Sequence, residues 1–137
     1  MKKKIDYFII REPLFGTVIN CYIGWTYKEM LEDLADPNIE IPEGFDKPEL
    51  RQDSGGVLLN CDSRDKTGMI RVLWLRHAPD NIERLGILAH ECVHAGQVVC
   101  KYRGISTDWS EPEPLAHYTQ YIFQQVLENC KKKLNGT

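Results

Sequence analysis

Short blocks of hydrophobic residues separated by polar turns run through the first 75 residues of the chain. Residues 7–10 and 17–23 are rich in β-branched and aromatic side chains and predict two short strands, joined by a turn at 13–16. Residues 57–61 and Met69–Leu75 flank a polar stretch and predict a β-hairpin. This part of the chain is therefore expected to supply a mostly antiparallel sheet.

Between the two strand pairs the pattern changes to a helical period. Thr26 and Glu29 form a capping-box pattern, and residues 27–35 carry hydrophobic side chains at helical spacing. The segment 36–53 contains three prolines and a glycine and predicts a long irregular connection. We expect a surface excursion, with a wrap over a functional cleft as the alternative.

The second half of the chain predicts two long helices. Asp80 and Glu83 form another capping-box pattern, and the helix that they open is expected to run to about Arg103, with Gly104 as its stop. A last helix is expected from residue 113 or 114 to about residue 133. Together these elements predict one α+β domain over residues 1–137.

The composition narrows the function classes. Hydrophobic residues make up 42% of the chain, the net charge is −3, and charges of both signs are scattered, so a nucleic-acid surface is not expected. No apolar run is long enough for a membrane span. The five cysteines are an odd number without a CxxC pair, which predicts reduced thiols and a cytoplasmic protein.

The candidate chemistry lies inside the predicted helix 80–103, in the pentapeptide His90-Glu91-Cys92-Val93-His94. On a helix, residues four apart differ by about 40° around the axis, so both imidazoles project from one face. Two imidazoles in this arrangement suit a tetrahedral zinc ion, and the glutamate can take a proton from a zinc-bound water. The HExxH motif therefore predicts a zinc site with Glu91 as general base.

A catalytic zinc ion usually has three protein ligands and one open position. Glu113 is the preferred third ligand, since it stands 18 residues beyond His94 at the start of the next predicted helix. Glu111 and His117 are alternatives. His117 lies one turn after Glu113 and is a candidate ligand, oxyanion donor or partner of a ligand.

These residues resemble those of the gluzincin metallopeptidases, which have HExxH on one helix and a glutamate ligand on the next. Glu113-Pro114-Leu115-Ala116 matches their Glu-x-x-(Ala/Ser) pattern, and the resemblance covers roughly residues 56–130. It implies a zincin-like domain in which His90, His94 and Glu113 bind Zn²⁺. It also implies a peptide or protein substrate that pairs in an extended conformation with strand Met69–Leu75. Small phage- or prophage-borne proteins with these motifs look similar.

Two other functions fit the same motif. One is a catalytically inactive, zinc-stabilised interaction or regulatory module, because the chain is too short for the separate helical domain of larger gluzincins that stabilises the oxyanion. The other is a deformylase-like amidase, in which a cysteine is the third ligand. Cys61 is the candidate for that position.

Overall fold

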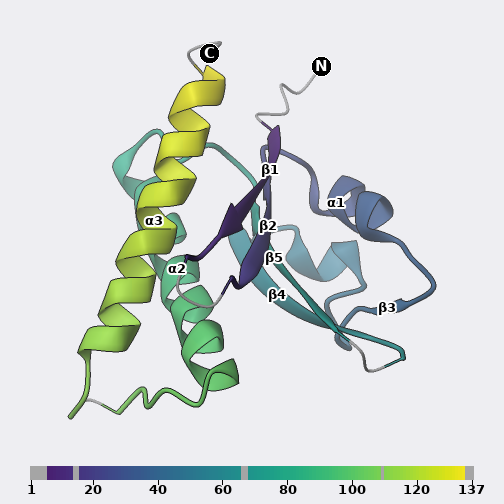
Figure 1. Ribbon diagram of the computed structural model, residues 1–137. Coiled ribbons are helices and arrows are strands. Elements are labelled where there is room, and N and C mark those ends of the chain that lie inside the picture. The colour runs from purple at the N-terminus through teal and green to yellow at the C-terminus, as the bar shows by residue number, and fades with distance from the viewer. Residues whose placement is uncertain (1–5, 14–15, 66–67, 109, 135–137) are drawn as a thin grey trace.

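The computed structural model describes residues 6–13, 16–65, 68–108 and 110–134. They form a five-stranded sheet with helices on both of its faces (Figure 1). The order in the sheet is β1-β2-β5-β4-β3, and every neighbouring pair is antiparallel except β2 and β5. The strands are β1 (Asp6–Arg11), β2 (Val18–Ile23), β3 (Ile39–Glu40), β4 (Gly56–Ser63) and β5 (Met69–Leu75). The predicted α+β class with a mostly antiparallel sheet is confirmed.

The helices divide between the two faces of the sheet. The two long ones, α2 (Ile82–Tyr102) and α3 (Glu113–Leu134), pack on one face, while α1 (Tyr27–Leu34) lies across the other (Figure 1). A short 3₁₀ helix, η1 (Pro48–Arg51), lies in the connection that precedes β4. Among the described residues, no helix combines the length and the apolar character that crossing a bilayer requires.

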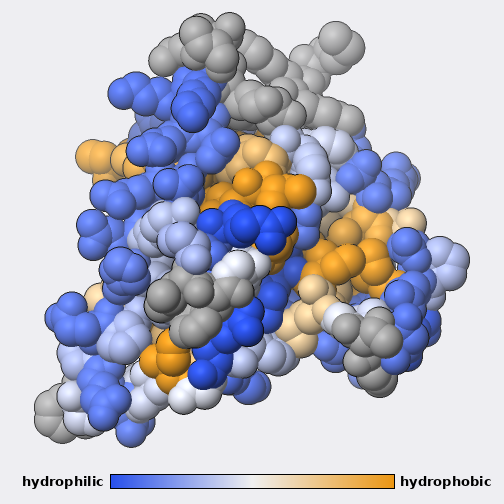
Figure 2. All heavy atoms as spheres, viewed as in Figure 1, coloured by the Kyte–Doolittle hydropathy of each residue, from blue (hydrophilic) through white to orange (hydrophobic). Residues whose placement is uncertain are grey.

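Two hydrophobic clusters hold the layers together because strand side chains alternate between faces. On β2, Cys21 and Ile23 point into the cluster beneath α2 and α3, whereas Tyr22 points into the cluster beneath α1. Trp74 of β5 belongs to the α1 cluster and donates its indole N–H to the Trp25 carbonyl at 2.9 Å. At the surface, Figure 2 shows separate apolar patches among hydrophilic residues.

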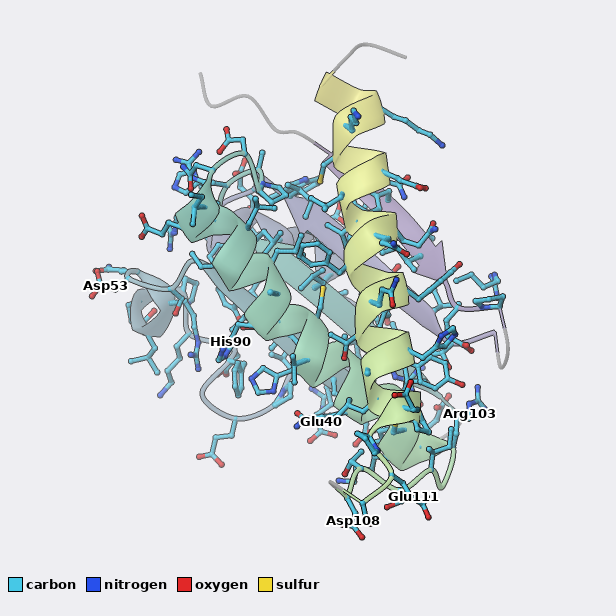
Figure 3. The ribbon with its side chains drawn as sticks, turned by 90° about the vertical axis from the view of Figure 1, so that its left-hand side faces the viewer. Glu40, Asp53, His90, Arg103, Asp108 and Glu111 are labelled. Atoms are coloured by element: carbon cyan, nitrogen blue, oxygen red, sulfur yellow. The ribbon has the colours of Figure 1, made fainter. Side chains whose placement is uncertain are left out.

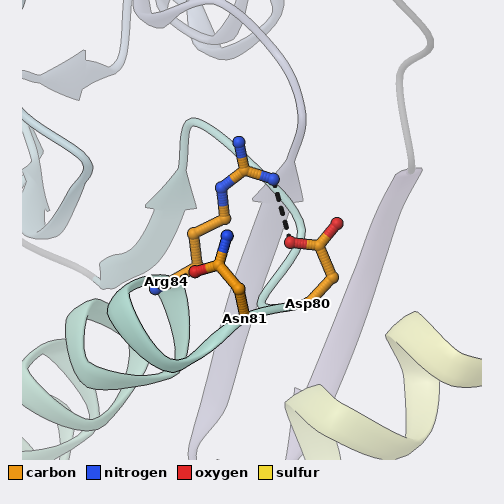
Figure 4. A network of polar contacts seen from close by, with 3 residues as sticks. All are labelled: Asp80, Asn81 and Arg84. Carbon is orange, nitrogen blue, oxygen red and sulfur yellow. Dashed lines mark hydrogen bonds and ion pairs between the residues drawn. The ribbon is translucent and has the colours of Figure 1, made fainter.

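The helix starts confirm one predicted cap and correct the other. Thr26 and Glu29 make both hydrogen bonds of a capping box at α1. At α2, however, the cap is Asn81, whose side-chain oxygen accepts from the Arg84 backbone N–H at 2.9 Å. Asp80 lies outside the helix and forms an ion pair with the Arg84 guanidinium, also at 2.9 Å (Figure 4). The asparagine oxygen can reach the third helical N–H, so it serves as the cap in place of the aspartate.

All five cysteines are buried free thiols, and burial raises the pKa of each. Burial, as the main cause, raises the pKa of Cys61 and Cys130 to about 11 and that of Cys92 to about 12. An unfolded thiol loses its proton near pH 8.5, so the folded protein binds more protons than the unfolded chain above that pH. The stability that these protonated thiols contribute is present below pH 8.5 and is lost between about pH 9 and 12.

We therefore expect the free energy of unfolding to fall as the pH rises from 8 to 10.5. Each thiol contributes a slope of at most about 1.4 kcal/mol per pH unit. Urea unfolding of the wild type and of Cys130→Ala at several pH values measures this effect, and the variant should show the shallower slope. Equal slopes in the two proteins would contradict the assignment to Cys130.

Candidate metal centre

The two faces of α2 have opposite environments. Leu88, Cys92, Ala95 and Val99 are buried against the sheet and α3. His90 lies about 200° around the helix from Cys92, so the pair His90 and His94 projects to the side that faces away from the core. The His90 side chain is 71% exposed and stands out from α2 in Figure 3. The packing of α2 thus leaves the HExxH face open to ligands.

The two imidazoles are arranged as a ligand pair. Their Nε2 atoms lie 3.2 Å apart, and the rings meet edge to face with centroids separated by 4.8 Å. Two nitrogens bound to one tetrahedral zinc ion are separated by about 3.3 Å, given a Zn–N distance of about 2.0 Å. In addition, Nδ1 of His94 lies 3.3 Å from Oε1 of Gln97. When Nδ1–H donates to that oxygen, Nε2 keeps its lone pair for a metal.

The Glu91 carboxylate lies beside the two imidazoles of His90 and His94. It is 7% exposed, and its Oε1 lies 4.0 Å from Nε2 of His90. Burial raises the pKa of this carboxyl, whereas His94, His90 and the backbone N–H of Leu58, which donates to it, lower the pKa. His90, Glu91 and His94 each offer a ligand atom within 4.8 Å of the others, and no other such group occurs among the described residues. The site therefore has two imidazoles beside a shielded carboxylate.

Strand β4 lines this site with an open edge. The bonds from the Arg76 N–H to the Gly55 carbonyl and from the Ser63 N–H to the Gly68 carbonyl place the odd-numbered residues against β5. The main-chain groups of Gly56, Leu58 and Asn60 consequently point outward, which agrees with the bond from Leu58 to Glu91. On that side β3 pairs only with Asp62 and Ser63. Among the described residues, no strand covers the outer edge of β4 over 56–61.

The predicted substrate strand, Met69–Leu75, does not have such an edge. It is β5, and it pairs with β2 on one side and with β4 on the other. Over residues 71–75 the backbone groups on both sides are used within the sheet, so an added peptide has no donors or acceptors to pair with there. The prediction that a substrate pairs with this strand is wrong. The local pattern did not reveal that β2 pairs with β5.

The connection between β3 and β4 forms one wall of the cleft. A cavity of about 430 Å³ lies between β4 and α2, and Phe45 from this connection contributes to its lining. The remaining lining includes Leu58, Asn60, Glu91, His94, Val98 and Lys101. The Tyr27 hydroxyl donates to the Phe45 carbonyl at 2.6 Å and anchors the segment. No residue of 36–53 is buried, as expected of a surface segment, and Phe45 is its residue in the described lining of the cavity. The segment is less irregular than predicted, since it contains β3 and η1.

Arg76 fixes the end of the same connection. Its Nε donates to the Ser54 carbonyl at 2.9 Å, and its Nη2 donates to the carbonyls of Arg51 and Gln52 at 2.7 and 3.0 Å. Charge-assisted bonds of this kind are stronger than neutral ones. One side chain at the end of β5 thus holds the residues that lead into β4 beside the site.

Two glycines bring α2 close to β4 at the level of the motif. A Cβ on Gly55 would lie 2.6 Å from Cδ1 of Ile87, one turn before Glu91. A Cβ on Gly56 would lie 2.9 Å from Cδ2 of Leu75, 3.1 Å from Cγ2 of Ile87 and 3.2 Å from the Trp74 carbonyl oxygen. The absence of side chains at these two positions therefore lets Glu91 reach Leu58.

Replacing Gly56 with Ala should destabilise the protein by about 1–3 kcal/mol, since the added methyl group overpacks a site bounded partly by backbone. Gly86→Ala is the matched control, because a Cβ there meets nothing within 4 Å and Gly86 lies inside α2. That variant should gain up to about 1 kcal/mol from helix propensity. Urea unfolding measures both, and equal effects of the two substitutions would argue against close packing at Gly56.

The proposed third ligands lie outside the group. Glu113 is the exposed first residue of α3, and neither it nor Glu111 or His117 has a ligand atom in the cluster. Figure 3 shows Glu111 and Asp108 by the connection between α2 and α3, well separated from His90. His117 is exposed and contacts the Tyr118 ring, with centroids 5.7 Å apart. The structure brings together the three motif residues and none of these three candidates.

Cys61, the third ligand of a deformylase-like site, also lies elsewhere. Its side chain is fully buried in the cluster beneath α1, on the face of the sheet opposite α2. Burial raises the pKa of this thiol to about 11, which disfavours the thiolate that zinc requires. Cys61 is therefore not a ligand to the His90 and His94 pair in this fold.

Sequence reasoning missed Phe45, Leu58 and Gln97 at the site. Gln97 follows His94 by three residues, so helical spacing could have identified it. Phe45 and Leu58 reach the site through tertiary contacts that no local pattern indicates. Comparison with protein-family models, curated proteins and solved structures gives no match. The functional assignment therefore depends on the motif and on this geometry.

Proposed function

We propose that the protein is a zinc-dependent peptidase of the gluzincin type whose active site is the HExxH face of α2. The observation that carries the proposal is the pair of Nε2 atoms 3.2 Å apart, flanked by the buried Glu91 carboxylate. A purely structural zinc site is closed by four protein ligands and has no use for a carboxylate held beside the metal position. The exposed histidines and the open strand edge favour a site that admits a substrate.

Each residue then has a defined role. His90 and His94 would hold the ion through Nε2, with Gln97 orienting His94. Zinc, when bound, would supply a Lewis acid that polarises the scissile carbonyl. Glu91 would accept a proton from the attacking water and pass it to the leaving amide nitrogen. The Leu58 N–H keeps one carboxylate oxygen oriented during both transfers.

The outer edge of β4 is the proposed binding surface for the substrate backbone. An extended peptide can add to an exposed strand edge through main-chain hydrogen bonds. The outward-facing groups of Gly56 and Asn60 flank Leu58, which contacts Glu91. A peptide paired there would pass the HExxH face, so its backbone would be presented to the catalytic group.

The test is zinc analysis followed by a peptidase assay. Tag-free protein is reconstituted with Zn²⁺, dialysed, measured for metal content by plasma mass spectrometry, and incubated with a denatured protein mixture whose new amino termini are counted. We expect one zinc per chain and new termini that disappear when a chelator is added. Protein that binds no zinc under these conditions would overturn the proposal.

A zinc-stabilised interaction module is the second candidate. The described lining of the cavity contains no tyrosine and no histidine besides His94 that could stabilise the oxyanion, which favours it. The zinc analysis and peptidase assay distinguish the two functions. An interaction module would bind zinc, and the zinc would raise its unfolding temperature, but no new amino termini would form.

A further inference from the structure

We infer that Lys101 makes the cleft selective for peptides with an acidic side chain two or three residues from the bond that is cut. This inference rests on the proposed function and specifies its substrate class. It concerns the half of the cleft that lies beyond His94, between the end of α2 and the middle of β4.

The positions along the cleft follow from the way in which α2 and β4 run beside each other. Ile87 packs on Gly55 and Gly56, Glu91 contacts Leu58, and Tyr102 accepts a hydrogen bond from the Asn60 amide at 3.0 Å. Residues later in the helix therefore meet residues later in the strand. Both elements run in the same direction along the cleft.

Lys101 lies two turns of α2 beyond His94, on the same side of the helix. It follows His94 by seven residues, which corresponds to about 10.5 Å along the helix axis. An extended peptide advances about 3.4 Å per residue. Since β4 advances only two residues between its contacts with Glu91 and Tyr102, Lys101 faces a substrate position two or three residues from the metal. Lys101 lines the same cavity as His94 and Asn60.

Lys101 places a positive charge in this half of the cleft. Lys101 has no ion-pair partner among the described residues, and the cavity lining near it consists of Gln97, Val98 and Asn60, which are uncharged. Glu91 is the only carboxylate in the described lining of this cavity. Arg71 lies behind Asn60, its guanidinium 5.1 Å from the centre of the Tyr102 ring. Asp62 is the nearest acidic residue along β4, Glu40 is its cross-strand neighbour, and neither forms an ion pair with Lys101.

An acidic side chain of the substrate fits these features best. Its carboxylate would pair with Lys101, which is exposed, so the attraction should be strongest at low salt. A basic side chain at that position would be repelled by Lys101 and by the bound cation. Selectivity at such a position comes from the repulsion of the wrong substrate as well as the attraction of the right one.

Binding of three labelled peptides tests the inference. The peptides are twelve residues long, share one otherwise uncharged sequence, and carry a single Glu, Gln or Lys at the centre. Fluorescence anisotropy with zinc-reconstituted Glu91→Gln protein, which should not cleave them, gives the dissociation constants. We expect the Glu peptide to bind about tenfold more tightly than the Lys peptide at low salt, with the Gln peptide between them.

Variants of Lys101 test whether this residue causes the difference in binding among the three peptides. In the same background, Lys101→Met should remove the discrimination and Lys101→Glu should reverse its order. Lys131→Glu, an exposed lysine on α3, is the matched control and should change nothing. Circular dichroism melting of each variant checks that the fold is kept.

The failures of this inference and of the proposed function are distinguishable. Equal binding of the three peptides, or an unchanged order in Lys101→Glu, would overturn the role of Lys101 while zinc-dependent cleavage still stands. A protein that neither holds zinc nor binds any of the three peptides would overturn both.

Discussion

Replacing His94 with Ala should abolish zinc binding and the stability that zinc adds. The substitution removes one of two imidazoles whose Nε2 atoms lie 3.2 Å apart, so only His90 and Glu91 remain of the group that the described residues form. Loss of a residue that merely orients a ligand costs 10- to 100-fold in metal affinity, so loss of the ligand itself should cost more than about 100-fold. His90→Ala should behave in the same way.

The stability effect has a calculable size. Zinc present at 100 times its dissociation constant raises the free energy of unfolding by about 2.7 kcal/mol when only the folded protein binds it. Urea unfolding with zinc and with a chelator should show this difference in the wild type and none in His94→Ala. His77→Ala, a histidine outside the group, is the control and should keep the wild-type difference. Zinc content at the wild-type level in both His90→Ala and His94→Ala would exclude this ligand set.

The same measurement decides the third ligand. The gluzincin resemblance predicts that Glu113→Ala loses zinc and that His117→Ala keeps it. In the structure Glu113 lies at the start of α3, outside the cluster. Zinc loss in Glu113→Ala would therefore show that the start of α3 approaches the histidines when the metal binds. Unchanged zinc content would leave His90 and His94 as the ligands that the chain supplies.

Replacing Glu91 with Gln should keep zinc but lower the rate of hydrolysis by about 10²- to 10⁴-fold, the usual contribution of a general base. The amide has the size of the carboxylate and can still accept the hydrogen bond from Leu58, so the fold and the ligand pair should be preserved. It cannot take a proton from water at neutral pH. The measurement is the rate of peptide cleavage per bound zinc.

Glu128→Gln on α3 is the matched control, since this glutamate is exposed and lies outside the group. It should keep both zinc and activity. Undiminished cleavage by zinc-loaded Glu91→Gln would remove Glu91 from the mechanism, and loss of zinc in that variant would mean that the carboxylate is a ligand.

Local patterns predicted most of the elements. The strand predicted at Met69–Leu75 has those bounds, and the helix expected from residue 113 or 114 is α3, Glu113–Leu134. The box at Thr26 and Glu29 formed as expected. These features depend on residues within four positions of one another, so the sequence nearby contains enough information to specify them.

Features that depend on distant residues were missed. The parallel pairing of β2 with β5 joins segments about 50 residues apart. It covers the side of β5 that the predicted hairpin would have left free for a substrate. The hydrogen bonds from Arg76 to the carbonyls of Arg51, Gln52 and Ser54 hold the end of the connection beside the start of β4. Neither feature has a local sequence signature. The strand pairing uses backbone groups that every residue has, and nothing near Arg76 in the sequence distinguishes it from the other arginines.

The sequence by itself determined that His90, Glu91 and His94 share a helix and that both imidazoles leave it on one side, since the helical period imposes this wherever the helix lies. Only the tertiary structure decided what surrounds that side. Packing of Ile87 on Gly55 and Gly56 brought Glu91 to the Leu58 N–H. The pairing of β3 with only Asp62 and Ser63 left the described edge of β4 over 56–61 without a neighbouring strand. The tertiary structure also placed Lys101 on the cleft and Glu113 outside the cluster, because these positions depend on how α2 and α3 dock on the sheet.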